Sequence, residues 1–332
     1  MPNKSNRNIQ YSIALLLLSV VVALLIGEGI LRIKNSSMTN YDIEMWRYAR
    51  ELKVRSVDPS LGFEHLKNKS AVLEGVDIQL NEWGLRGGPV TPAAPDTRRI
   101  LFLGGSTTLG WGVREEETVE KRLEKLLAAA GVSAQVLNAG VGNYNAERYV
   151  SRFFKQLTGL NPSDIVVQYF MRDAEDLQND RGNILLRNSE LALTLWIAYH
   201  RLIDRFGDAN LVERYRKVYD RGQPGFVVME QELKKLSQYA QEHGIRLYFM
   251  MIPDVHELVD YKFMFVHDIM RNFAKANGYA YVDLLPAMTG LRPQEIWAMP
   301  GDPHPNAFAH RLMADAIFPL IVRPSVQGSI EK

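Results

Sequence analysis

The sequence ILFLGGSTTLGWG at residues 100–112 is the most informative stretch for the fold class, because it joins a short apolar run to a glycine-rich turn. Four consecutive apolar residues are typical of a strand that is buried on both faces. Residues 117–130 follow as an amphipathic helix that ends at Gly131. The stretch therefore predicts a strand, a tight turn and a helix, which is the first part of a βαβ unit.

The same alternation of strand and helix continues toward the C-terminus. Further strands are expected at residues 135–138, 164–170, 246–252 and 279–284, and helices at residues 146–157, 230–243, 266–277 and 307–320. Buried strands that alternate with helices predict a parallel sheet with helices on both faces. We therefore expect a three-layer α/β/α domain with five parallel strands at residues 98–324, with a helical insertion at 175–229 and a tail at 325–332.

An uncharged stretch of 20 residues, 8–27, lies near the N-terminus. About 20 helical residues reach across the roughly 30 Å hydrocarbon core of a bilayer. Lys4 and Arg7 precede the stretch, which favours a cytoplasmic N-terminus at residues 1–7. We expect a single-pass transmembrane anchor in the inner (cytoplasmic) membrane, with the rest of the chain outside the cytoplasm. A cleaved signal peptide is the main alternative.

Residues 28–97 form a stalk and a small connector between the anchor and the α/β domain. Residues 76–80 alternate apolar and polar side chains, which predicts a half-buried strand. The sequence NEWGLRGG at residues 81–88 predicts a turn, and three prolines then mark an extended linker.

The composition excludes several classes of function. The 332 residues are 46% hydrophobic and 23% charged, which is ordinary for a globular protein. Lys and Arg total 39 against 38 Asp and Glu, so the chain has no basic footprint for a nucleic-acid partner. The chain has no cysteine, which removes disulfides, thiolate metal sites and Cys nucleophiles.

Polar clusters follow the predicted strands at their carboxyl ends, where doubly wound sheets bind their ligands. These clusters are residues 104–108, 138–145, 172–173 and 301–306. They are far apart in sequence, but the predicted fold brings them to one rim of the sheet. We therefore expect the functional site at this rim.

Ser106 is the candidate nucleophile, because two glycines before it permit a turn that presents its hydroxyl. The alternative is that Ser106 only caps the following helix. The Gly-x-Ser-x-Gly elbow of α/β-hydrolases is absent, since Thr108 occupies its last position. His304 is the candidate base, and Asp302 is close enough in sequence to orient it. A metal site that uses Asp302, His304 and His310 matches no strong ligand motif.

These residues resemble the conserved blocks of the SGNH (GDSL-type) hydrolases. ILFLGGSTTLGWG looks like the first block, NAGVGNYN at 138–145 like the second and DPHPN at 302–306 like the last. The segment 81–88 resembles the entry region of membrane-anchored members that act outside the cytoplasm. The resemblance implies a flavodoxin-like domain and a Ser–His–Asp esterase or acyl-transfer mechanism without metal or organic cofactor. It makes Ser106 the nucleophile, His304 the base and Asp302 the residue that orients it.

The resemblance also implies an oxyanion hole, and here the sequence departs from the family. The second-block glycine position falls on Asn143, with Gly142 one residue earlier. The third-block asparagine position falls on Asp173, and an ionised carboxylate there would repel an oxyanion. Three explanations remain open: a protonated Asp173, a replacement by Arg172, or a structural role for this loop.

The function expected from the sequence is therefore that of an extracytoplasmic serine esterase, a carboxylic ester hydrolase. Its expected partners are the membrane and an acyl ester of saccharide or cell-envelope material. One alternative is an O-acyltransferase that uses the same triad. The other is a catalytically silent, membrane-tethered domain that binds polysaccharide or serves as a scaffold.

Overall fold

The computed structural model describes residues 4–36, 40–92, 94, 96–177, 184–207 and 211–322. The tail predicted at 325–332 and the first three residues of the predicted cytoplasmic segment lie outside these ranges. The chain divides into two compact units, Met1–Trp46 with Asp180–Ala209, and Arg47–Asn179 with Asn210–Lys332. We call the first the helical unit and the second the α/β unit.

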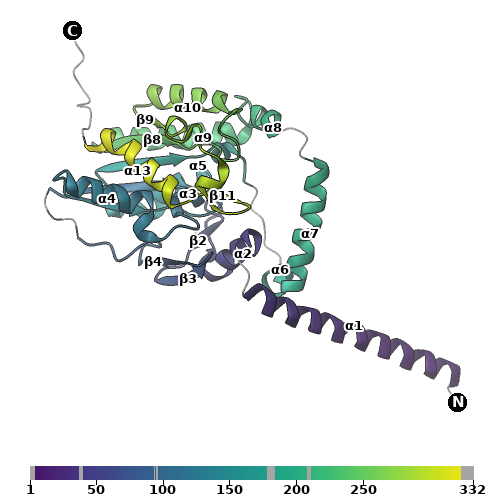
Figure 1. Cartoon of the computed structure of the whole chain (residues 1–332). Coiled ribbons are helices and arrows are strands. Elements are labelled where there is room, and N and C mark those ends of the chain that lie inside the picture. Colours follow the sequence, from purple (N-terminus) through teal and green to yellow (C-terminus); the bar gives the residue numbers. More distant parts are fainter. Residues whose placement is uncertain are drawn as a thin grey trace, which may run out of the picture. The chain divides into compact units, whose positions relative to one another are not determined.

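The α/β unit is built on a sheet of five parallel strands. They are β5 (Arg98–Gly104), β6 (Ala134–Asn138), β7 (Asp164–Tyr169), β8 (Arg246–Met251) and β9 (Ala280–Asp283). The strand order is β6-β5-β7-β8-β9, so the chain leaves β5 on one side and returns on its other side (Figure 1). Phe102 of β5 pairs with Asn138 of β6 and with Val166 of β7. Strand order therefore reverses at β5, and the carboxyl end of this strand is where a ligand site is expected.

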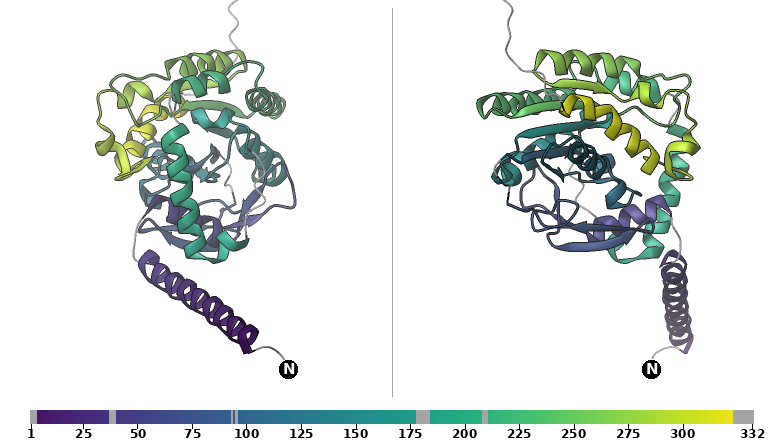
Figure 2. Two further views of the ribbon diagram at one scale, coloured as in Figure 1. Left: turned by 90° about the vertical axis from the view of Figure 1, so that its right-hand side faces the viewer. Right: turned by 60° about the vertical axis from the view of Figure 1, so that its left-hand side comes forward.

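Helices cover both faces of this sheet, which confirms the predicted three-layer fold. Helices α4 (Val119–Ala129) and α13 (Ala307–Val322) lie on one face, and α5 (Ala146–Arg152), α9 (Pro224–Glu242) and α10 (Met264–Ala276) lie on the other (Figure 2). Alternate residues of β5 divide between the two apolar cores. Ile100 belongs to the cluster of α4 and α13, whereas Leu101 belongs to the cluster of α5, α9 and α10.

Several predicted boundaries shift for local reasons. Helix α4 begins at Val119, because the Thr118 side chain accepts the Lys121 N–H and caps the helix. Helix α9 begins at Pro224, six residues before its predicted start of 230, since proline suits the first turn of a helix. The remaining short elements of the α/β unit are α3 (Ser106–Leu109), η1 (Glu115–Glu117), η2 (Phe153–Leu157), η3 (Thr158–Leu160), η4 (Met171–Ala174), α8 (Leu211–Val218), α11 (Leu285–Met288), α12 (Pro293–Ile296), β10 (Trp297–Met299) and β11 (Asp302–Pro305).

From Arg47 on, the segment before the sheet belongs to the α/β unit. It contains the end of α2 (Tyr41–Glu51) and the strands β1 (Lys53–Arg55), β2 (Phe63–His65), β3 (Lys69–Leu73) and β4 (Val76–Leu80). Strand β4 buries every second side chain, as its alternating sequence predicts. Arg86 then pairs with Asn138 at the end of β6, which joins this segment to the sheet.

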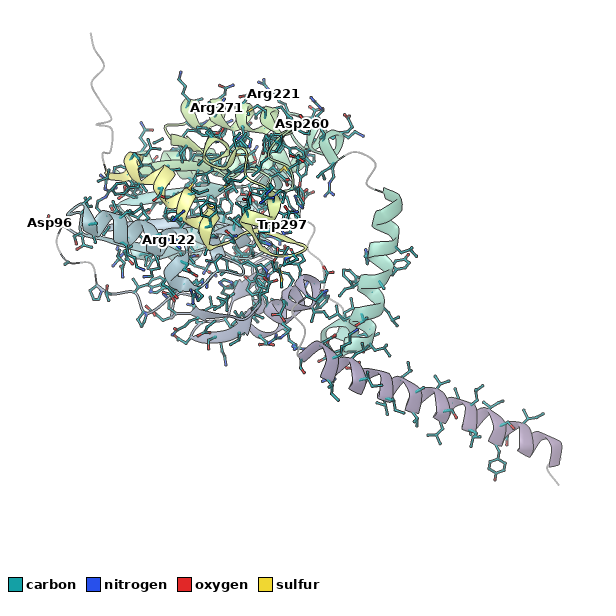
Figure 3. The ribbon with its side chains drawn as sticks, in the orientation of Figure 1. Asp96, Arg122, Arg221, Asp260, Arg271 and Trp297 are labelled. Atoms are coloured by element: carbon teal, nitrogen blue, oxygen red, sulfur yellow. The ribbon has the colours of Figure 1, made fainter. Side chains whose placement is uncertain are left out.

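The helical unit contains α1 (Lys4–Ser36), α6 (Ile184–Asn188) and α7 (Glu190–Gly207). The stretch Ile9–Ser36 of α1 is long and apolar enough to cross a membrane, by length and composition. The side chains of residues 9–26 are exposed and project outward from the helix (Figure 3). Glu28 joins α1 to α7, because its carboxylate accepts the Ser189 hydroxyl at 2.9 Å and the Leu191 N–H at 3.0 Å. Asn35 donates to Glu190 at 2.8 Å.

Candidate active site

Ser106 is the first residue of α3, directly after the carboxyl end of β5. The turn that presents it needs glycine, because a Cβ at Gly104 would lie 2.1 Å from the Thr108 Oγ1 atom and 2.8 Å from the Gln168 carbonyl oxygen. Gly105, not Ser106, occupies the cap position of α3, and no side chain caps this helix. The hydroxyl of Ser106 is therefore not used as a helix cap.

His304 bonds to Ser106, although 198 residues separate them in sequence. The distance from His304 Nε2 to Ser106 Oγ is 2.8 Å. On the other side of the ring, His304 Nδ1 lies 2.5 Å from Asp302 Oδ1. Ser106 from one segment of the chain and Asp302 and His304 from another thus form one hydrogen-bonded chain.

Asp302 is fully buried and is surrounded by hydrogen-bond donors. Its Oδ1 accepts the backbone N–H of His304 at 3.0 Å, and its Oδ2 accepts the Trp111 Nε1–H at 3.0 Å. Burial alone would raise the pKa of Asp302, but the hydrogen bonds from His304 hold it below its ordinary value. An ionised Asp302 accepts a hydrogen bond from the Nδ1–H of His304. This bond keeps the proton on Nδ1 and leaves Nε2 free to accept the Ser106 proton.

The segment that carries His304 and Asp302 is more ordered than the predicted loop. Asp302–Pro305 is strand β11, which pairs antiparallel with β10. Trp297 of β10, labelled in Figure 3, donates its Nε1–H to the Val255 carbonyl at 2.8 Å. Strand β11 can contain two prolines because both strands of a two-stranded ribbon are edge strands, where proline is tolerated.

The loop at residues 138–145 packs against the turn that presents Ser106. The Val141 N–H donates to the Gly104 carbonyl at 3.2 Å, and the Asn138 side chain donates to the Thr108 carbonyl at 2.5 Å. A Cβ at Gly140 would lie 2.1 Å from the Leu109 nitrogen, so only glycine permits this approach. Two of the predicted clusters thus share one compact corner of the α/β unit.

The backbone N–H and the backbone carbonyl of Gly142 are both bonded by side chains that precede the sheet in sequence. Its N–H donates to the Tyr48 hydroxyl at 2.9 Å, and its carbonyl accepts from Lys53 Nζ at 2.9 Å. The Tyr48 hydroxyl also lies 2.6 Å from Nε2 of His65, whose Nδ1 lies 2.9 Å from the Gly84 carbonyl. Since that carbonyl only accepts, His65 is protonated on Nδ1 and Tyr48 donates to Nε2.

This arrangement distinguishes the two candidate oxyanion donors of the loop. The N–H of Gly142 is already committed to Tyr48. The neighbouring Asn143 is exposed and has a φ of 64°, a left-handed conformation that asparagine tolerates. Asn143 is therefore the better candidate of the two.

Asp173 is buried within the turn η4, where its carboxyl contacts the backbone of the turn and the Tyr149 hydroxyl of α5. Its Oδ2 accepts the Phe170 N–H at 3.1 Å, which closes the turn. Burial raises the pKa of Asp173 to about 8, so the group is largely protonated at neutral pH. Two of the open explanations therefore agree with the structure: a neutral carboxyl and a structural role for this loop.

Several residues of this site were missed by sequence reasoning because they act through long-range contacts. Arg86 is buried and donates to the carbonyls of Leu109 and Gly110 at 2.6 Å each, which fixes the end of α3. Tyr48 and Lys53 hold the 138–145 loop as described. The only sequence signal is a run of charged and aromatic residues before the domain, which is not specific.

The metal alternative finds no support at His310. This side chain is fully buried, and its Nδ1 accepts the Val119 N–H at the start of α4. Burial lowers the pKa of His310 to about 3, so the ring is neutral. Among the described residues there is no group of three or more His, Asp or Glu side chains that could hold a metal ion.

No protein-family model matches the chain, and no curated protein matches its sequence. Solved structures do match. TesA is 16% identical, with 68% of this chain and 98% of that chain covered and a TM-score of 0.45. A variant of Axe2, an acetyl-xylooligosaccharide esterase from Geobacillus, is 15% identical, with 70% and 97% covered and a TM-score of 0.46. A G-D-S-L family lipolytic protein from Desulfitobacterium hafniense is 12% identical, with 68% and 99% covered and a TM-score of 0.41. At these identities the similarity to G-D-S-L-type proteins and esterases is one of fold alone.

Proposed function

We propose that the chain is a serine esterase of the SGNH type, a carboxylic ester hydrolase. The observation that carries the proposal is the hydrogen-bonded chain from Ser106 Oγ through His304 to the buried Asp302. A serine hydroxyl becomes a nucleophile when an adjacent imidazole accepts its proton, and a carboxylate that orients the imidazole completes the arrangement.

The reaction begins when Ser106 Oγ attacks the ester carbonyl carbon and its proton passes to His304 Nε2. Asp302 stabilises the imidazolium that forms. The tetrahedral intermediate then expels the alcohol, which takes the proton from His304 and leaves an acyl group on Ser106. A water molecule, deprotonated by His304, attacks this acyl group. The carboxylic acid is released and the Ser106 hydroxyl is restored.

We assign the oxyanion hole to the backbone N–H groups of Ser106 and Asn143. Ser106 N–H lies at the start of α3, and Asn143 belongs to the loop that packs against the nucleophile turn. Loss of one such donor typically reduces the rate by about 100- to 1000-fold. We do not assign this role to Asp173, because its carboxyl accepts a bond within its own turn.

The helix α1 is proposed to remain on the protein as a single-pass anchor in the cytoplasmic membrane, with the α/β unit outside. The support comes from its C-terminal part, where Glu28 accepts bonds from Ser189 and Leu191 at the start of α7. Arg32 also donates to the Asn188 carbonyl at 2.8 Å. Cleavage after residue 27 would cut helix α1 and leave Glu28 and Arg32 on a new N-terminal segment. Their bonds to residues 188–191 therefore favour an intact helix over a cleaved signal peptide.

The proposed substrate class is an acyl ester of saccharide or cell-envelope material. A site tethered outside the cytoplasmic membrane meets the polymers of the envelope at high local concentration. Acetylated sugars are also the substrates of Axe2, which is an acetyl-xylooligosaccharide esterase. Their alcohol leaving group and small acyl group suit the reaction described above.

The experiment uses the full chain in detergent micelles with p-nitrophenyl acetate and with acetylated xylo-oligosaccharides. Wild type should hydrolyse both, and Ser106→Ala should lose at least about 1000-fold in rate. Thr107→Ala is the matched control, because it removes the next hydroxyl of the same helix and should keep the wild-type rate. A Ser106→Ala variant that stays active would refute the serine mechanism. Acetyl groups transferred to sugar, in place of free acetate, would favour the acyltransferase.

A further inference from the structure

The tip of the hairpin between β3 and β4 carries an unusual residue. Leu73 and Val76 pair across the hairpin, so Glu74 and Gly75 form a two-residue turn. Both have left-handed backbones, with φ of 51° and 72°. The second position is suited to glycine, but a glutamate at the first is uncommon and is disfavoured in this conformation. A strained position that keeps a large side chain invites a search for what the side chain does.

The side chain of Glu74 reaches the triad. Its carboxyl hydrogen-bonds to Asp302. It passes Gly112, where a Cβ would lie 3.0 Å from Glu74 Oε2 and 2.8 Å from the Ala298 Cβ. Gly112 follows Trp111, which itself donates to Asp302. The absence of a side chain at Gly112 is therefore what lets Glu74 approach the triad carboxylate.

The other contacts of Asp302 show which of the two carboxyl groups, Glu74 or Asp302, carries the proton of their hydrogen bond. The N–H of His304, the Nδ1 of His304 and the Nε1–H of Trp111 all face Asp302. Three donors of this kind stabilise an ionised carboxylate. Two carboxyl groups can hydrogen-bond only if one of them keeps a proton, and here that group is Glu74.

We propose that Glu74 is a positioning residue of the active site, a protonated carboxyl that donates to Asp302 and fixes it for His304. The proposal rests on the proposed esterase function. It makes the β3–β4 hairpin, which lies outside the segment of about 98–322 that resembles the family, a working part of the site. Without this donor, Asp302 loses one of the contacts that fix it for His304, and its negative charge is less well balanced.

The test measures the rate at which a fluorophosphonate labels the full chain in detergent micelles between pH 5 and 9. Wild type is compared with Glu74→Gln, Glu74→Ala and the control Asp77→Asn. Asp77 is matched, because it is a carboxylate on the same hairpin whose side chain faces solvent. Labelling that is absent from wild type would refute the proposed function itself, before Glu74 is tested.

Glu74→Gln keeps an N–H donor without a charge, so its labelling rate should match that of wild type. The acidic limb of its pH–rate profile, which is the fall in labelling rate toward low pH, should match as well. Glu74→Ala should label about tenfold more slowly, which is the effect expected for one lost bond to a charged group. Its acidic limb should also move to higher pH, because a less balanced Asp302 charge favours the protonated imidazole of His304. Asp77→Asn should behave as wild type.

Two outcomes would overturn the proposal. An acidic limb that moves to lower pH in Glu74→Gln would show that Glu74 is ionised in the wild type. A Glu74→Ala variant with the wild-type limb would show that Glu74 only shapes the hairpin. If Glu74→Ala fails to fold, Glu74→Asp provides the decision, since a shortened acid that cannot reach Asp302 should move the limb in the same direction as Ala.

Discussion

At the scale of single residues, the site depends on how each carboxyl group is partnered. Asp302 is buried among donors, which holds its pKa below the ordinary value and keeps it ionised. Asp173 is equally buried, but burial dominates and raises its pKa to about 8. The same side chain thus serves as an anion beside His304 and as a neutral group within the turn η4. The difference arises from the number of donors around each group.

The neutral state of Asp173 predicts a pH-dependent effect on stability. Its pKa is about 8 in the folded chain, against about 4 when unfolded. Its contribution to stability is therefore complete below about pH 4 and is lost as the pH rises through 8. Asp173→Asn cannot ionise, so thermal unfolding should show a larger gain over wild type at pH 8 than at pH 5.

The same variant also tests the catalytic part of the account. Asparagine keeps an acceptor oxygen for the Phe170 N–H and matches the neutral state of Asp173, so the esterase rate should stay within about threefold of wild type. A loss of about 100-fold in a folded variant would assign a catalytic duty to Asp173.

At the scale of elements, the segment before the sheet holds the loops of the site. Tyr48 and Lys53 fix Gly142, and Arg86 fixes the end of α3. Lys53 is buried between aromatic rings, with its Nζ 4.2 Å from the Tyr48 ring centre and 4.0 Å from that of Phe63. Burial lowers the pKa of Lys53 well below its ordinary value. The elements before the sheet therefore fix the loops of the candidate site, in addition to connecting the two parts of the chain.

Tyr48→Phe should impair the site without unfolding the chain. The change removes the acceptor of the Gly142 N–H and the donor to His65, so the 138–145 loop loses its fixed position. We expect a rate of p-nitrophenyl acetate hydrolysis about tenfold lower. Tyr239→Phe on α9 is the matched control and should keep the wild-type rate. Equal rates for both variants would show that the Tyr48 hydroxyl is not needed to hold the 138–145 loop for catalysis.

How much the sequence predicts also depends on scale. The five parallel strands follow from local apolar runs, and Ser106, Asp302 and His304 follow from short motifs at strand ends. Glu74 and Tyr48 could not be found in this way, because a hairpin and a helix end bring them to the site from elsewhere in the chain. The sequence leaves three explanations open for Asp173 at the third-block position, because it does not reveal whether a carboxyl in a turn is buried and protonated.

At the scale of the whole molecule, the account joins an apolar N-terminal helix to a chain that carries a serine triad. In the helical unit, Glu28 of α1 accepts hydrogen bonds from Ser189, which precedes α7, and from Leu191 of α7, and these bonds support the proposal that α1 stays on the chain. The α/β unit by itself brings Ser106, Asp302 and His304 together. The proposed membrane-held esterase rests on these two features.

The most direct test is the intact mass of the full chain, purified from membranes, before and after reaction with a fluorophosphonate. The account predicts the uncleaved mass of 37.8 kDa and one phosphonyl adduct per chain. The adduct should be absent from Ser106→Ala and present in Thr107→Ala. A folded wild-type chain that takes up no adduct, or an adduct that persists in Ser106→Ala, would contradict the claim that Ser106 is the activated nucleophile.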